Sequence, residues 1–196
     1  GSDNTGIGSR SLKQTTTGGS NTAIGRSALA NNTTASNNTA VGYASLLVNT
    51  TGTSNTAVGY NALDANTTAN DNTAVGSGAL SATTTGYGNT AIGRNSFSAN
   101  TTGSNNTFVG LNTAYSNTTG HTLTGIGVGA LAGNTTGTQN IGLGTNANMT
   151  QTTGSNTVCI GHNAFSSSTT VSNEITLGDG NISNLRCADT SISSLS

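Results

Sequence analysis

Residues 55–63 have the sequence Asn-Thr-Ala-Val-Gly-Tyr-Asn-Ala-Leu, and close copies of this stretch lie at 21–29, 38–46, 72–80 and 89–97. A strict short period is typical of a solenoid, in which each repeat forms one coil stacked on the last. The glycine of the stretch returns every 17 residues in eleven copies, without insertion or deletion, at Gly8, Gly25, Gly42, Gly59, Gly76, Gly93, Gly110, Gly127, Gly144, Gly161 and Gly178. The sequence therefore predicts an all-β solenoid, a parallel β-roll of eleven 17-residue coils, over residues 1–178.

Two columns of the repeat are apolar. The column directly before the glycine includes Val41, Val58 and Val75. The column four residues after the glycine includes Leu46, Leu63 and Leu80. Small residues such as Ala57 and Ala62 precede these positions. Because successive side chains of a strand point to opposite faces, we expect two short strands per coil. Each strand would hold its large apolar residue inside and its small residue outside, where another chain could approach closely.

The other half of the coil is polar and carries a second glycine column, which includes Gly52, Gly86 and Gly103. Glycine and asparagine tolerate positive φ and favour tight turns, so we expect this half to form the outer bend. Identical Asn and Thr side chains stacked about 4.8 Å apart can also form hydrogen-bonded ladders.

The composition excludes several functions. Hydrophobic residues make up 31% of the chain and charged residues 6%, and the formal net charge is −1. Five Lys and Arg against six Asp and Glu cannot form the basic stripe that nucleic-acid binding needs. No apolar run approaches the roughly 20 residues of a membrane helix, so we expect no membrane insertion. Nothing in the sequence calls for a cofactor.

Two large apolar side chains per coil make a thin core. Burying each one contributes roughly 1.5–3 kcal/mol, whereas ordering each backbone residue costs about 1–2 kcal/mol. Association of identical chains would add buried surface, and closed rotational symmetry is its usual form. The sequence therefore favours a homo-oligomer.

The repeat Asn-Thr-Ala-Val-Gly-x-x-Ala-Leu resembles the head repeats of trimeric autotransporter adhesins, which form left-handed parallel β-rolls. The resemblance covers residues 4–178, although the coils here are longer than is usual in that family. It implies a trimer, and one alternative function is therefore the head of a bacterial trimeric adhesin at the cell surface.

The C-terminal region resembles a different family. Residues 173–186 read Asn-Glu-Ile-Thr-Leu-Gly-Asp-Gly-Asn-Ile-Ser-Asn-Leu-Arg, and 190–196 read Thr-Ser-Ile-Ser-Ser-Leu-Ser. These segments are similar to the region just upstream of the intramolecular chaperone domain of phage tail fibres and tail spikes. That family implies a homotrimer, assembled by a C-terminal chaperone that then cuts itself off after a serine, here Ser196. We expect residues 179–196 to form a trimeric cap ending at this cleavage site. The implied function is a structural and receptor-binding segment of a virion tail fibre, bound to a host surface glycan or outer-membrane protein.

The residue after the first glycine varies most in chemistry and should face outward. Arg26, Tyr43 and Tyr60 occupy this column in successive coils, and Arg94 follows two coils later. Together they would make an aromatic and basic strip able to stack on a sugar. The alternative is that these side chains merely cover a strand surface.

Neither catalysis nor a metal site is supported by the sequence. The six carboxylates occupy different coil positions, whereas a glycosidase needs two close together. His121 and His162 lie outside any metal-ligand spacing, and so do Cys159 and Cys187. Cys159 takes the alanine position of its coil, so we expect a small buried thiol. We therefore predict that the chain is not an enzyme.

Two further alternatives remain. Recurrent pairs such as Thr33-Thr34 and Thr67-Thr68 could form a flat array that binds ice, although only one threonine of each pair would face outward. The chain could also be a mechanical spacer without a ligand.

Overall fold

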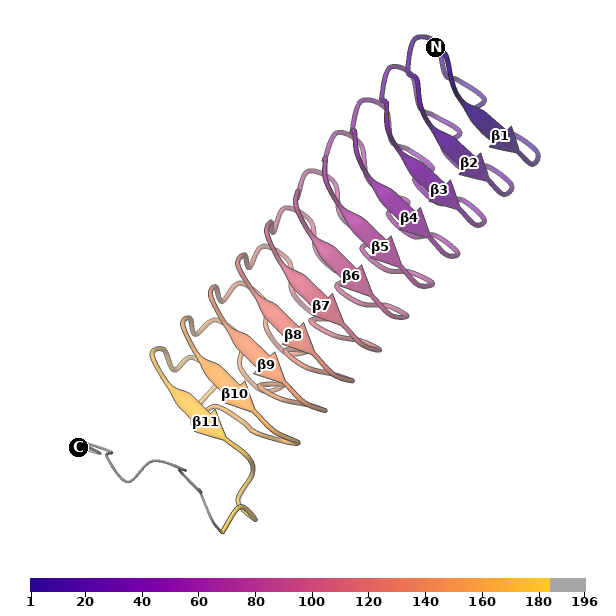
Figure 1. Ribbon diagram of the computed structural model, residues 1–196. Helices are drawn as coiled ribbons and strands as arrows, with labels where there is room; N and C mark the ends of the chain where they lie inside the picture. The colour runs from indigo at the N-terminus through magenta and orange to yellow at the C-terminus, as the bar shows by residue number, and fades with distance from the viewer. Residues whose placement is uncertain (184–196) are drawn as a thin grey trace, which may run out of the picture.

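The computed structural model describes residues 1–183 and is a single stack of parallel coils without helices in that part of the chain. One strand per coil contributes to an 11-stranded sheet whose strands follow chain order from β1 to β11 (Figure 1). The strands are Thr5–Ile7 (β1), Thr22–Ile24 (β2), Thr39–Val41 (β3), Thr56–Val58 (β4), Thr73–Val75 (β5), Thr90–Ile92 (β6), Thr107–Val109 (β7), Thr124–Ile126 (β8), Ile141–Leu143 (β9), Val158–Ile160 (β10) and Ile175–Leu177 (β11). The predicted all-β solenoid of 17-residue coils is confirmed.

Each strand pairs with the next in strict register, so that every residue faces its equivalent one coil away. Thr56 pairs with Thr73, for example, and Val58 with Val75. The glycine that follows each strand is needed for this stacking. Gly59 has a φ of 143°, and a Cβ there would lie 2.5 Å from the carbonyl oxygen of Gly76. No other residue type combines this backbone angle with so close an approach.

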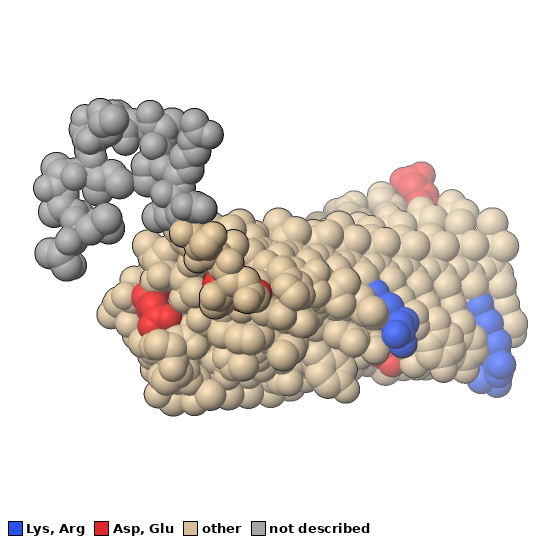
Figure 2. Space-filling model, turned by 90° about the horizontal axis from the view of Figure 1, so that it is seen from below, with Lys and Arg blue, Asp and Glu red and all other residues tan. Residues whose placement is uncertain are grey.

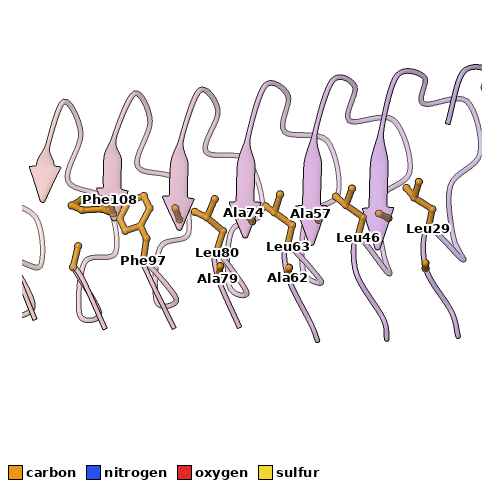
Figure 3. Close-up of a cluster of buried hydrophobic side chains, with 14 of the residues drawn as sticks. Leu29, Leu46, Ala57, Ala62, Leu63, Ala74, Ala79, Leu80, Phe97 and Phe108 are labelled. Carbon is orange, nitrogen blue, oxygen red and sulfur yellow. The ribbon is translucent and has the colours of Figure 1, made fainter. Parts of the chain in front are cut away.

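The expectation that the β-branched column lies inside is wrong. Ala57 and Ala74 are completely buried, whereas the valines beside them are half-exposed, and Ile92 at the same position is 39% exposed. Figure 3 shows the reason, because leucines from the opposite wall extend toward the strands and fill the interior. A coil this narrow leaves room for only a methyl group on the inner face of the strand. The larger β-branched side chains therefore point outward.

In the coils of residues 1–183, the second strand expected at the leucine column does not form, and a series of turns takes its place. Leu46 and Leu63 have φ values of 49° and 52°, in the left-handed region rather than the extended one. Their backbone N–H groups still donate to the next coil, as from Leu46 to the Ala62 carbonyl at 3.0 Å. Both the leucines and the small residues before them are buried. The small face expected outside thus lies within the core.

The polar half of the coil is not simply an outer bend, because the second glycine column and the asparagines equivalent to Asn38 and Asn49 are buried. Asn38 donates from Nδ2 across the coil to the Gly52 carbonyl at 2.9 Å, and its Oδ1 accepts the backbone N–H of Asn55 at 2.9 Å. Asn49 donates to the same Gly52 oxygen at 2.9 Å. These bonds repeat with few changes from coil to coil and confirm the predicted ladders. We number coil positions from the Asn38 equivalent, so that the strand occupies positions 2–4 and Asn49 lies at position 12.

Where one coil departs from the repeat, its neighbour compensates. Phe108 replaces the usual alanine of the strand and contacts Phe97 of the preceding coil, with ring centroids 4.6 Å apart. The next coil carries Gly125, where a Cβ would lie 2.7 Å from the Phe108 ring. Similarly, the buried Asn148 replaces a core leucine and donates to Thr157 of the next coil at 2.8 Å, and also to Gln151 of its own coil at 2.6 Å.

The C-terminal expectations fall mostly outside the described residues. The last strand, β11, ends at Leu177, close to the predicted boundary at 178. Most of the predicted cap at 179–196 lies beyond residue 183, as do Cys187 and the expected processing terminus Ser196. The cap and the homotrimer remain predictions.

Candidate functional site

The candidate site lies on the outer surface directly after the strands. The glycine at the end of each strand turns the chain, and the next residue, at position 6, points into solvent. Tyr43 is 45% exposed and Tyr60 is 56% exposed, and Arg26 and Arg94 are exposed as well. Strict stacking therefore places this variable column on one line along the rod, as the sequence predicts.

Three of the four predicted site residues come together. The rings of Tyr43 and Tyr60 stack with centroids 5.3 Å apart and an angle of 10° between their planes. The guanidinium carbon of Arg26 lies 5.7 Å from the centroid of Tyr43, within the range of a cation–π contact. Arg94 does not join them, because Ser77 occupies the coil between it and Tyr60.

This geometry limits what the strip can bind. Tyr43 lies between Arg26 and Tyr60, so both of its faces are engaged. Tyr60 has its other face toward the coil of Ser77, whose small side chain leaves that ring accessible. A flat apolar face of a sugar could stack there, with Arg94 two coils farther along, about 10 Å away.

A second group of exposed side chains, which the sequence did not single out, lies on the turn side of the coils, where turns follow each strand. Tyr115 is 51% exposed and Met149 is 36% exposed, both at position 10, and Ala132 lies between them. They line a groove of about 460 Å³. The signal that could have found it is a small residue flanked by two large ones at the same position of adjacent coils.

The described histidines and carboxylates lie apart along the rod or in small groups. His121 is exposed, and its Nδ1 lies 3.3 Å from the Thr122 hydroxyl. His162 is exposed at position 6. Hydrogen bonds from Asn181 lower the pKa of the Asp179 carboxyl, and a smaller effect comes from His162. Within residues 1–183, no three His, Cys, Asp or Glu side chains gather closely enough to hold a metal ion.

Cys159 is buried in the alanine column of the strands, as predicted for a small core thiol. Burial raises the pKa of this thiol, and the hydrogen bond with Thr176 only partly offsets that effect. A buried thiol with a raised pKa is a poor nucleophile, so Cys159 acts as a core residue.

No family model, curated protein or solved structure matches this chain. The described residues also include no helix long and apolar enough to cross a membrane. Charged side chains are few on the face shown in Figure 2, where they form small isolated groups on an otherwise uncharged surface. Any recognition by this surface would therefore rely on hydrogen bonds and stacking more than on charge.

Proposed function

We propose that the chain is a structural and receptor-binding segment of a phage tail fibre that attaches to a host surface glycan or outer-membrane protein. The observation that carries this proposal is a regular rod whose exterior bears the stacked Arg26, Tyr43 and Tyr60 side chains. At about 4.8 Å per coil the stack is on the order of 50 Å long. The resemblance of 173–196 to the region before a fibre chaperone supports the same assignment.

The outward β-branched column gives the proposed fibre its association surface. Ile24, Ile92, Ile126 and Ile160 are 38–45% exposed, and the valines between them are half-exposed. This apolar stripe follows one edge of the coil from end to end. A second copy with the same stripe would cover it, since closed rotational symmetry brings identical surfaces together. The number three comes from the family resemblances.

Light scattering on a sizing column tests the association. We expect a mass near three times the 19.2 kDa chain. Replacing Ile92 and Ile126 together by lysine should lower the mass to that of a single chain, because it places charge on the stripe. The control replaces the exposed Thr85 and Thr119 by lysine and should leave the mass unchanged. A single-chain mass for the wild type refutes the trimer.

Deletion tests attachment. In a phage that carries this fibre, removing two whole coils that include Tyr43 and Tyr60 keeps the register of the remaining stack. We expect host adsorption to fall, while removal of two coils without these tyrosines should leave it unaltered. Equal adsorption by both deletions would mean that the strip does not bind. A trimer that attaches to no glycan or host cell would instead favour the mechanical spacer, and display of the chain on the surface of the bacterium that makes it would favour the adhesin head.

Ice binding is a second candidate because of one observation. Thr56 and Val58 both point outward from β4, and in most coils the same threonine and β-branched residue form an in-register array on the sheet. A flat, regular array of hydroxyl and methyl groups is suited to ordered water. The array shares its face with the proposed association stripe, so a trimer would cover it. Thermal hysteresis measurements test this candidate, and equal melting and freezing temperatures of ice in its presence would exclude it.

A further inference from the structure

The groove beside Tyr115 arises from side chains that are missing in one coil. Position 10 carries Tyr115, Ala132 and Met149 in three successive coils, and position 7 carries Gly129 in the middle one. The middle coil therefore has only small residues where its neighbours have large ones. Because the coils are in register, the small side chains of the middle coil leave one hollow of about 460 Å³ between the two neighbouring coils.

The width of the hollow matches one flat ring. Tyr115 and Met149 are two coils apart, which is about 9.6 Å at 4.8 Å per coil. Carbon atoms in contact lie about 3.5–4.0 Å apart. Contacts on both faces of a ring take up about 7–8 Å, so the space over Ala132 admits one ring, including a puckered one, between Tyr115 and Met149.

A second hollow of about 400 Å³ adjoins the first, and the two share Asn95, Tyr115 and Ser116. It reaches Ser81, so the combined groove spans four coil steps, or about 19 Å. A groove of this length suits an extended chain of several units better than a single small molecule.

The lining is partly apolar and partly polar, and it carries no Lys, Arg, Asp, Glu or His. Asn95, Asn112 and Asn146 supply amides along one wall, and Ser116 supplies a hydroxyl. The Oδ1 of Asn112 is shielded and has no hydrogen-bond partner among the described residues, so turning it toward a hydroxyl would break no existing bond. Asn61 shares this feature outside the groove, so the feature supports the site only in combination with the tyrosine and the hollow.

We propose that this groove binds an uncharged oligosaccharide, with one pyranose ring stacked on Tyr115 over Ala132 and its hydroxyls bonded to the asparagine wall. Shallow sites of this kind combine an aromatic platform with a few placed polar groups. The inference rests on the proposed attachment function, because it names the ligand class and a place for it. It goes beyond that proposal by assigning a second contact, at the groove, in addition to the Tyr43–Tyr60 strip.

Two variants of the full chain test the groove. Tyr115→Ala removes the platform. Ala132→Leu fills the hollow, and Leu47 occupies the same position in another coil, so the coil accepts this side chain. Tyr87→Ala is the matched control, since Tyr87 is 54% exposed and lies outside the groove. Tyr60→Ala tests the strip.

The probe is an array of neutral and acidic bacterial surface oligosaccharides. We expect the wild-type chain to bind neutral members and both groove variants to bind about tenfold more weakly, while Tyr87→Ala binds as the wild type does. Unchanged circular dichroism shows that the variants are folded. Loss of binding in Tyr60→Ala but not in the groove variants overturns the groove and leaves attachment by the strip intact. Wild-type binding by Ala132→Leu, or a preference for acidic glycans, also overturns the groove. Silence of the wild-type chain on every glycan overturns glycan attachment as well.

Discussion

The buried asparagine ladder leads to a quantitative prediction at Asn72. Its side chain is completely buried. Its Nδ2 donates to the Gly86 carbonyl at 2.9 Å, and its Oδ1 accepts the backbone N–H of Asn89 at 3.0 Å. Within residues 1–183, the Gly86 oxygen accepts no other hydrogen bond. Asn72→Leu therefore leaves two buried backbone groups without partners, and each such group costs about 1–3 kcal/mol. We expect a total loss of about 2–6 kcal/mol.

The same substitution one coil earlier should cost less. Asn55 donates to the Ala69 carbonyl at 2.8 Å, but that oxygen also accepts from Asn66 Nδ2 at 3.1 Å. Asn55→Leu therefore leaves only the backbone N–H of Asn72 without a partner, which lowers the free energy of unfolding by about 1–3 kcal/mol. The difference arises because the Asn72 coil has Thr83 where the Asn55 coil has Asn66.

A native example follows the same rule. Leu123 occupies this ladder position in its own coil and is buried. There the Gly137 carbonyl still accepts from Asn134 Nδ2 at 3.1 Å. The fold thus accommodates leucine at this position where asparagine is retained at position 12.

Urea unfolding followed by far-UV circular dichroism, at one protein concentration, measures the difference. Asn31→Leu is the control, since Asn31 is half-exposed and Val48 occupies the same position one coil later. It should change the free energy of unfolding by less than about 0.5 kcal/mol. The reasoning is refuted if Asn72→Leu and Asn55→Leu differ by less than about 0.5 kcal/mol, or if both behave like the control.

Three further changes test other parts of the coil. Gly125→Ala should destabilise the wild type, because the added Cβ would lie 2.7 Å from Phe108. The same substitution should not destabilise the Phe108→Ala variant, and a double-mutant cycle by urea unfolding measures this coupling. Gly59→Ala should lower the free energy of unfolding by at least about 1–3 kcal/mol, because alanine is strained at the positive φ of Gly59. The control Ser77→Ala, on the exposed surface, should be near neutral in the same assay. Hydrogen bonds from Ser167 lower the pKa of the Glu174 carboxyl from its ordinary value of 4.5. The stabilisation of the fold by these hydrogen bonds is therefore present above pH 4.5, and it is lost as the pH falls through the lowered pKa of Glu174. The protection factor of the Ser167 amide, which is its intrinsic exchange rate divided by the observed rate, should therefore fall at acid pH in the wild type but show no such step in Glu174→Gln. Identical profiles would exclude this role.

The period, the register and the ladders could be predicted because each depends only on what recurs every 17 residues. Which residue of the strand points inward could not be predicted in this way. Hydrophobicity favours Val58 over Ala57 as the buried residue, yet the interior width is set by Leu63 and its equivalents on the opposite wall. That width is a property of the whole cross-section, and it depends on the left-handed φ at the leucines, which apolar side chains seldom adopt.

The candidate sites divide in the same way. Tyr43 and Tyr60 are equivalents in adjacent coils, so the repeat alone places their rings side by side. The groove at Tyr115 depends on which side chains are small in the coil between Tyr115 and Met149. Finding it requires comparison of two positions across three coils, together with the knowledge that both positions face outward.

Core changes in this rod are answered by the adjacent coil, as Phe108 is answered by Gly125 and Asn148 by Thr157. Nearest-neighbour coupling of this kind is expected where each repeat contacts only the repeats beside it. Exposed side chains at positions 6 and 10 need no compensating change in the core, and these positions carry residues as different as serine, arginine, tyrosine and methionine. Recognition surface can therefore change at these columns without altering the stack. Binding is for this reason better sought at positions 6 and 10 than at the glycine and asparagine columns, whose uniformity is explained by packing and hydrogen bonding.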